Sequence, residues 1–213
     1  MAELLEGFTP YKENDAERYT KFRWWSGLTF GDILDRAADI HPEKEAFVDG
    51  KTRLSYGEAR EKTNKLAIGL MDLGIKPLNR VLVQLPNWNE FVFAYFALQK
   101  IGAITVLLID RYRQLEINRL IRLTGATAWI VASRYEKTDY APIINDVLKE
   151  HPHLKHIITV RGDGDQKPFS SLEGLIERTE LTENNLARLA ERRPDPMQVA
   201  HMGPTGGTTG EPK

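Results

Sequence analysis

The last eleven residues of the 213-residue chain concentrate the side chains that could bind an anion. Residues 203–213 read Gly-Pro-Thr-Gly-Gly-Thr-Thr-Gly-Glu-Pro-Lys, with four glycines, three threonines and a terminal lysine. Glycines let backbone N–H groups approach anionic oxygens closely, threonine hydroxyls donate further hydrogen bonds, and lysine adds a positive charge. This composition indicates a loop that holds phosphate groups.

Two common nucleotide-binding motifs do not describe this segment. The pattern G-x-x-x-x-G-K-[ST] fails because no two glycines five residues apart stand directly before a lysine. The pattern G-x-G-x-x-G fails because Thr205 occupies the first glycine position, although Gly207 and Gly210 have the last spacing. A dinucleotide-binding fold is therefore disfavoured. Glycine content alone leaves open a solvent-exposed loop or a disordered tail.

The residues before this segment predict the scaffold that positions it. Short apolar runs typical of buried strands lie at residues 80–85, 103–109, 126–131, 157–160 and 197–202. Helices are predicted between and before them, at residues 29–40, 55–73, 88–101, 115–123 and 141–150. Strands separated by helices indicate parallel β-α-β crossovers. We therefore predict a three-layer αβα fold with a mostly parallel sheet, whose last strand feeds the glycine-rich segment.

Local signals mark several of the predicted boundaries. Thr29 is a predicted helix cap, and Ser55 with Glu58 forms a predicted capping box. Asn87 is predicted to cap the apolar helix that follows it. The dipeptide Asp49-Gly50 favours a tight hairpin turn between two short strands.

The chain divides into two parts on the same evidence. Residues 1–27 show no clear periodicity and hold six aromatic side chains, so we expect an arm that packs across the body. Residues 28–213 are expected to form one α/β subdomain. Within it, residues 161–196 are polar and are expected to form a surface excursion with one or two short helices.

Composition excludes several classes of function. With 29 basic and 30 acidic residues the formal net charge is -1, so no global field favours nucleic acid or an anionic membrane. There are no cysteines, and His151 and His153 lack a surrounding cluster of ligands, so we expect no metal site in this chain. No membrane span and no signal peptide are expected, which favours a cytoplasmic protein.

The order of residues in the glycine-rich segment carries a family resemblance. Residues 205–213 resemble the TSGTTGxPK signature of the acyl-adenylate-forming superfamily, which includes acyl-CoA synthetases, peptide-synthetase adenylation domains and luciferases. Gly206 stands where many members have serine, but a Gly-Gly-Thr-Thr-Gly version resembles the aryl acid adenylating enzymes. Residues 54–58, residues 80–87 and residues 5–10 also resemble this superfamily, the last two ranges its 2,3-dihydroxybenzoate-activating subgroup. Residues 104–106 and 109–110 depart from that subgroup, which tends to have prolines there.

The resemblance implies an ATP-dependent ligase with Mg²⁺. A carboxylate, expected to be an aryl acid, would attack the α-phosphorus of ATP, and the acyl group would then pass to a thiol of coenzyme A or of a carrier protein. Carried over position by position, the residues that would line the β- and γ-phosphates are Thr205, Gly206, Gly207, Thr208, Thr209, Gly210 and Lys213.

The same resemblance implies that the chain is an N-terminal part of such an enzyme. The acid pocket, the magnesium-binding acidic residue and a C-terminal domain with the catalytic lysine would all lie beyond Lys213. We therefore expect no catalytic residue in this chain, no complete reaction by it alone, and a need for the missing C-terminal part. The alternative is a truncated paralogue that acts as a non-catalytic binding or interaction module.

Overall fold

The computed structural model describes residues 5, 7–50, 52–162 and 169–204, and it contains a parallel six-stranded sheet. The strand order across this sheet is β10-β4-β3-β5-β8-β9. These strands are β3 (Arg80–Gln84), β4 (Ile104–Leu107), β5 (Ala128–Ala132), β8 (His156–Val160), β9 (Ser170–Ser171) and β10 (His201–Met202). Two antiparallel hairpins stand outside it, β1 (Glu45–Asp49) with β2 (Thr52–Ser55) and β6 (Arg134–Tyr135) with β7 (Thr138–Asp139).

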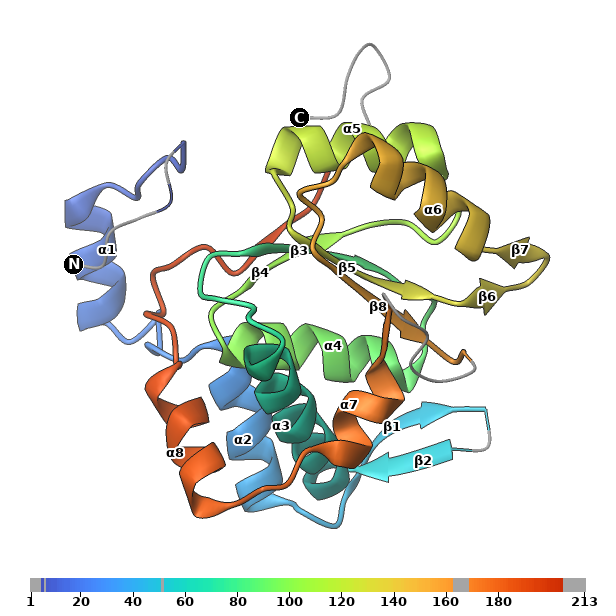
Figure 1. Cartoon of the computed structure of the whole chain (residues 1–213). Coiled ribbons are helices and arrows are strands. Elements are labelled where there is room, and N and C mark those ends of the chain that lie inside the picture. The colour runs from blue at the N-terminus through green and yellow to red at the C-terminus, as the bar shows by residue number, and fades with distance from the viewer. Residues whose placement is uncertain (1–4, 6, 51, 163–168, 205–213) are drawn as a thin grey trace.

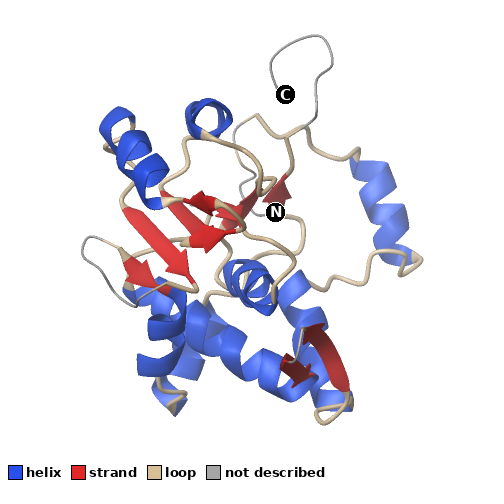
Figure 2. Ribbon diagram, turned by 90° about the vertical axis from the view of Figure 1, so that its right-hand side faces the viewer, coloured by secondary structure: helices blue, strands red, loops and turns tan. Residues whose placement is uncertain are grey.

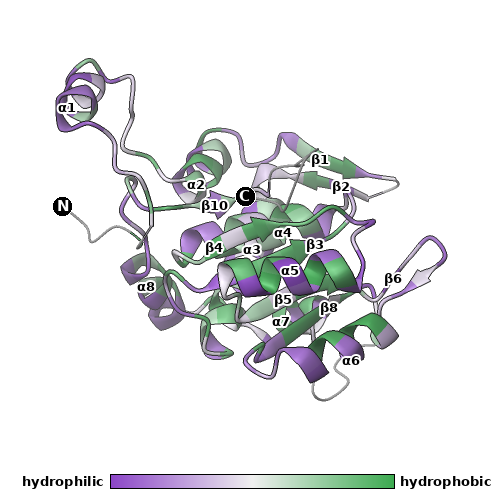
Figure 3. Cartoon of the chain, turned by 90° about the horizontal axis from the view of Figure 1, so that it is seen from above, coloured by the Kyte–Doolittle hydropathy of each residue, from purple (hydrophilic) through white to green (hydrophobic). Residues whose placement is uncertain are grey.

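Helices cover both faces of the sheet, as Figures 1 and 2 show. One face carries α5 (Gln114–Thr124) and α6 (Ala141–Glu150), which lie over the strands in Figure 3. The other face carries α2 (Phe30–Ile40), α3 (Tyr56–Asp72), α4 (Asn89–Lys100), α7 (Leu172–Arg178) and α8 (Glu183–Glu191). The predicted three-layer αβα architecture with a mostly parallel sheet is confirmed.

Burial explains why the apolar runs become central strands. All five residues of β5 are buried, and so are four of the five residues of β3. Strands covered by helices on both faces lose the alternation of apolar and polar residues, because both faces lie in the core. Trp129 on β5 is the largest side chain among the fully buried ones. Each fully buried large apolar side chain contributes about 1.5–3 kcal/mol to folding.

The predicted helix cap at Thr29 and the predicted capping box at Ser55 are confirmed, and Thr29 also forms a capping box. Thr29 Oγ1 accepts from the Asp32 backbone N–H (3.2 Å), while the Asp32 carboxylate accepts from the Thr29 N–H (2.7 Å). Ser55 and Glu58 exchange the same pair of bonds at 3.2 and 2.8 Å. Each box satisfies N–H groups that have no partner inside their own helix.

The prediction that Asn87 caps α4 is wrong. The N-cap residue is Trp88, which makes no side-chain cap hydrogen bond, and the helix starts at Asn89. The carboxylate of Asp49, at the end of β1, instead accepts from the Asn89 N–H at 3.4 Å. The acceptor for the first N–H group of α4 therefore comes from the distant β1–β2 hairpin and not from the neighbouring Asn87. No local pattern could reveal this.

One or two short helices were predicted in the excursion at residues 161–196, and its described residues contain two, α7 and α8, together with strand β9, which was not predicted. It is more than a surface loop, because Leu172 and Leu175 are buried. A Cβ atom on Gly69 of α3 would lie 3.3 Å from the Leu175 side chain, so glycine lets α7 pack closely against α3. This segment carries the chain from β8 near one edge of the sheet to β10 at the other.

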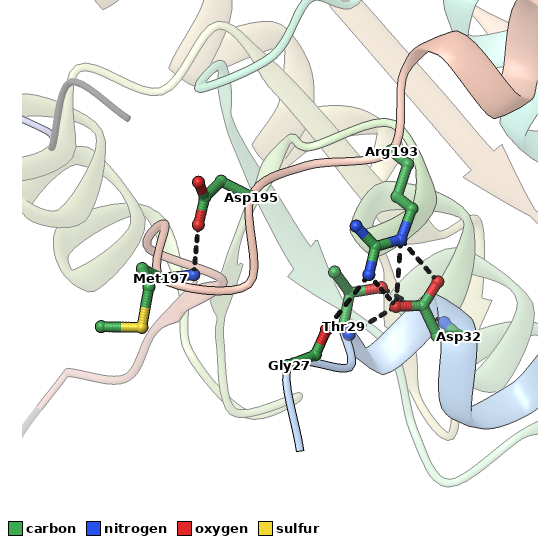
Figure 4. A network of polar contacts seen from close by, with 6 residues as sticks. All are labelled: Gly27, Thr29, Asp32, Arg193, Asp195 and Met197. Atoms are coloured by element: carbon green, nitrogen blue, oxygen red, sulfur yellow. Dashed lines mark hydrogen bonds and ion pairs between the residues drawn. The ribbon is translucent and has the colours of Figure 1, made fainter. Parts of the chain in front are cut away.

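Arg193 holds the end of the segment between β8 and β10 in place, as Figure 4 shows. Its guanidinium donates to the Asp32 carboxylate through Nη2 (2.7 Å) and Nε (2.9 Å), and to the carbonyl of Gly27 (3.2 Å). The carboxylate of Asp32 thus closes the Thr29 capping box and pairs with Arg193. Burial alone would raise the pKa of Asp32, but the hydrogen bonds from Arg193 and Thr29 outweigh it and lower that pKa below its ordinary value.

Replacing Asp32 by asparagine removes both the ion pair and the carboxylate half of the capping box. We expect Asp32→Asn to lower the free energy of unfolding by about 1–2 kcal/mol at pH 7, measured by urea denaturation. Because the folded-state pKa of Asp32 is depressed, its stabilisation is present above about pH 4 and is lost as pH falls further. The difference between wild type and variant should therefore shrink toward pH 3.

A matched control lies on the same helix. Asp39 pairs with Arg60 near the end of α2, and its side chain is 70% exposed. Asp39→Asn should cost no more than about 0.5 kcal/mol, as exposed pairs usually do. An equal loss in the two variants, or a loss that does not change with pH, would contradict the role assigned to Asp32.

Candidate functional site

The face of the sheet to which the connections pass changes between β3 and its two neighbouring strands. The connection after β3 passes to α4 on one face of the sheet, whereas the connections after β4 and β5 pass to α5 and α6 on the other (Figure 1). In open parallel sheets, ligands bind outside the carboxyl ends of the strands at such a reversal. The candidate site is therefore the carboxyl edge of the sheet around the end of β3.

Gln84, the last residue of β3, lies at the centre of this edge and is 1% exposed. Its Nε2 is 3.1, 3.3 and 2.9 Å from the carbonyl oxygens of Ile109, Asp110 and Tyr112. These carbonyls belong to the turn that joins β4 to α5, residues 109–112, called here the β4–α5 turn. One buried amide therefore contacts three carbonyls of the neighbouring connection.

Two further side chains hold the β4–α5 turn from other elements. The hydroxyl of Tyr140, which precedes α6, donates to the Asp110 carbonyl at 2.5 Å. Arg113 Nη1 donates to the carbonyls of Asp110 (3.0 Å) and Tyr112 (2.9 Å). Burial raises the pKa of the Tyr140 phenol, so the hydroxyl stays protonated and can donate. The turn is thus fixed from β3, from α6 and from α5.

A second polar group, around Arg161, lies farther along the same edge. The guanidinium of Arg161 is 4.0 Å from the ring of Trp88, and it pairs with Glu90 (2.9 Å) and with Asp49. Burial alone would lower the pKa of Arg161, but hydrogen bonds to Glu90 and Asp49 raise it. The φ angle of Arg161 is 55°, a conformation that favours glycine. This group ties the β1–β2 hairpin to the start of α4 and to the end of β8.

The glycine-rich segment follows β10 at the same carboxyl edge. His201 and Met202 pair with Thr105 and Val106 of β4, so the chain emerges from β10 beside the strand that leads into the β4–α5 turn. The structure describes this stretch as far as Pro204. The residues predicted to line the phosphates lie outside the described residues: Thr205, Gly206, Gly207, Thr208, Thr209, Gly210 and Lys213.

His201, which directly precedes the segment, is exposed on β10. Its ring lies 6.2 Å from that of Phe30, and its Nδ1 is 3.5 Å from the hydroxyl of Tyr95. Burial raises the pKa of Tyr95. The imidazole therefore sits against aromatic rings at the edge of the sheet.

A cavity lies beside β10, and its described lining includes no residue of β3. It has a volume of about 630 Å³ and lies between the N-terminal arm and residues 196–201. Aromatic side chains of the arm line it, including Tyr11, Trp24 and Trp25, and its described lining holds no aspartate, glutamate, lysine or arginine. Polyphosphates are usually bound by lysine and arginine, and the described lining of this cavity offers neither.

The described part of residues 1–27 includes the helix α1 (Glu13–Lys21), which lies apart from the three layers in Figures 1 and 3. None of its residues is buried. The aromatic rings beside it contact one another, as Tyr19 does with Trp24 and Trp25 at centroid distances of 5.4 and 5.1 Å.

Neither a metal site nor a membrane helix is found in the part of the chain that the structure describes. Within residues 5, 7–50, 52–162 and 169–204, no three histidine, aspartate or glutamate side chains form a group that could hold an ion. The rings of His151 and His153 lie 5.6 Å apart without a third ligand in this part of the chain. None of the described helices is both long and apolar enough to cross a membrane.

Gln84, Tyr140 and Arg161 were not predicted as site residues from the sequence. Gln84 gave a faint signal, because it is a polar residue near the end of an otherwise apolar run. Tyr140 and Arg161 gave none, since their contacts lie 30 to 112 residues away along the chain. The tertiary fold alone brings them to this edge.

Comparison with known proteins agrees with this fold. The apo structure of MbtA from Mycobacterium smegmatis superposes with a TM-score of 0.82 at 31% sequence identity, over 97% of this chain and 37% of that chain. The anthranilate CoA ligase AuaEII, solved with anthranoyl-AMP, superposes with a TM-score of 0.71 at 22% identity, which supports the fold alone.

Similar sequences point the same way. The chain is 36% identical over 208 residues to the 2,3-dihydroxybenzoate-AMP ligase of Bacillus subtilis. The aligned region covers 97% of this chain and 36% of the relative. It is 35% identical over 216 residues to the salicyl-AMP ligase / salicyl-S-ArCP synthetase of Mycobacterium tuberculosis, with 98% and 36% covered. The chain thus spans little more than a third of these relatives. A sequence model described as AMP-binding enzyme matches residues 34–213, so the chain belongs to the family of AMP-binding, adenylate-forming enzymes.

Proposed function

We propose that this chain is the N-terminal part of an ATP-dependent ligase that activates an aryl carboxylic acid as its acyl adenylate. The observation that carries the proposal is the sequence Gly-Gly-Thr-Thr-Gly at residues 206–210, a few residues after β10, an edge strand of the parallel sheet. Relatives that act on salicylate and 2,3-dihydroxybenzoate support the choice of an aryl acid.

The proposed reaction has two steps. An oxygen of the substrate carboxylate attacks the α-phosphorus of ATP, the bond to the bridging oxygen breaks, and pyrophosphate leaves. A thiol then loses its proton and attacks the acyl carbon, which forms a thioester and releases AMP. The thiol belongs to coenzyme A or to a carrier protein. Related proteins use either acceptor by name, a CoA ligase in one case and a salicyl-S-ArCP synthetase in the other.

Within this chain, we assign the pyrophosphate end of ATP to the glycine-rich segment. Backbone N–H groups around Gly206, Gly207 and Gly210 would donate to phosphate oxygens, and the hydroxyl groups of the threonines would add further donors. The ammonium of Lys213 would offset the charge that builds up as pyrophosphate departs. Catalysis by such a site rests on positioning and on charge stabilisation.

Magnesium would screen the phosphate charge when bound. The described residues do not fit a magnesium site, because no group of three potential ligands occurs among them. We therefore assign no magnesium ligand among the residues that the structure describes. Because the chain spans about 36% of the relatives, we propose that it does not complete the reaction alone.

The proposal predicts acid-dependent exchange of labelled pyrophosphate into ATP. We expect exchange with 2,3-dihydroxybenzoate or salicylate by the longest polypeptide that the gene encodes, and none by the 213-residue chain. Benzoate and aliphatic acids serve as comparison substrates. If the longest form exchanges with no acid while the fold is intact, a non-catalytic binding module becomes the better interpretation.

The glycine-rich segment can be tested in the active form by single substitutions. Thr208→Ala and Lys213→Ala should each slow exchange about 10- to 100-fold, because each removes a donor to charged oxygens worth about 1.5–3 kcal/mol. Glu211→Gln, in the same segment but outside the assigned set, is the matched control and should exchange at nearly the wild-type rate. Unchanged rates in both alanine variants would remove these residues from the site.

A further inference from the structure

Two adjoining cavities form a groove beside β10. The first, of about 630 Å³, lies between the N-terminal arm and residues 196–201. The second, of about 240 Å³, adjoins it at Leu28 and at residues 198–200, which line both cavities. The described lining of the two holds one carboxylate, that of Asp195, and no lysine or arginine. The groove is therefore largely apolar.

Exposed hydrophobic side chains gather along this groove. Thirteen large hydrophobic side chains are exposed in the described part of the chain, and six of them, called here the groove set, line the two cavities: Tyr11, Trp24, Leu28, Phe30, Ile33 and Met197. Hydrophobic residues scattered singly over a surface need no explanation, whereas a contiguous patch marks a contact with another segment or molecule. The groove set therefore indicates a surface that such a partner covers.

The arm on one side of the groove has a helix that would gain from such cover. α1 has nine residues, and none of them is buried. A helix this short is marginally stable in water and depends on the packing of one face. The aromatic rings of the arm contact one another, as Tyr11 and Trp25 do at a centroid distance of 4.8 Å. A partner that buried these rings would stabilise the arm.

The six-stranded sheet ends beside the same groove. β10 pairs with β4 along one edge, and no described strand pairs with its other edge. The unpaired N–H and C=O groups of an edge strand can bind a further strand. His201 of β10 also lines the groove, so an added strand would lie against the groove set.

We infer that the groove and the open edge of β10 form the docking surface for the C-terminal part of the same polypeptide, through an extended apolar segment. The inference rests on the proposed function, in which the polypeptide continues beyond residue 213. The relatives support this occupant, because the aligned region covers only 36% of each. β10 is the last described strand, so polypeptide that follows it starts beside the groove. Its effective concentration there exceeds that of a separate molecule.

The first test compares side-chain oxidation by hydroxyl radicals in the 213-residue chain and in the longest polypeptide that the gene encodes. Trp24 is 65% exposed, and Leu115 on α5, outside the groove, is 69% exposed, so the two form a matched pair. In the longest polypeptide we expect the oxidation rate of Trp24 to fall at least about fivefold and that of Leu115 to change less than about twofold. Equal protection of both side chains, or no protection of Trp24, would overturn the inference.

The second test places a carboxylate on the surface. Ile33 on α2 and Leu123 on α5 are 50% and 57% exposed. In the 213-residue chain, Ile33→Asp and Leu123→Asp should each melt within about 3 °C of wild type, because both positions face water. In the longest polypeptide, Ile33→Asp should lower the melting temperature at least about 5 °C more than Leu123→Asp does, because the new carboxylate would be buried without a partner. Equal shifts of the two variants would contradict the docking surface.

Further outcomes separate this inference from the proposed function and from a second copy of the chain. Pyrophosphate exchange by the longest polypeptide without protection of Trp24 would overturn the docking surface alone. Protection without exchange would support the docking surface and contradict the ligase activity. Protection of Trp24 that rises with concentration in the 213-residue chain would overturn the inference, because the occupant would then be a second copy. A gene that ends at residue 213 would overturn both proposals.

Discussion

The pairing of β3 on both of its edges is the constraint on which the rest of the molecule depends. Val81, Leu82 and Val83 pair with β4 on one side and with β5 on the other. A strand in this position has every backbone group engaged and both faces in the core, so its residues are apolar and its register is fixed. Because the connections leave β3 and its two neighbours toward opposite faces, the same strand creates the polar edge at which Gln84 lies.

The long crossing from β8 to β10 then decides where the glycine-rich segment begins. This connection packs against α3 on one face of the sheet, where Arg188 pairs with Asp72 at 2.8 Å. It ends at the Arg193–Asp32 pair. These ion pairs are partly exposed, so each contributes modestly to stability. Their importance is geometric. Together with the buried Leu175, they fix the path of the roughly 40 residues that lead from β8 to β10, the strand beside β4.

The elements that the sequence predicted well are those whose signals are local. The Ser55–Glu58 capping box and the Asp49-Gly50 hairpin depend on residues a few positions apart, and both are confirmed. The cap of α4 and strand β9 depend on partners 12 or more residues away, so no local pattern revealed them. The same physics applies at the candidate site. The glycine-rich segment has a local signature, whereas the contacts of Gln84 form only when β4 folds beside β3.

The extent of strand pairing differs across the sheet, from β3, which is paired along both edges, to the short edge strand β10. The apolar run at residues 197–202 predicted a longer strand, but only two residues of it pair with β4. The chain before β10 is held chiefly through Ala200, whose carbonyl accepts from the Thr105 N–H (3.2 Å) and from Gln99 Nε2 (3.0 Å). Segments that bind ligands are drawn from the less stable parts of a fold, because they must adjust when a ligand arrives. The proposed phosphate-binding segment thus follows a strand that pairs with β4 at two described residues, whereas the β4–α5 turn is held by the side chains of Gln84, Tyr140 and Arg113.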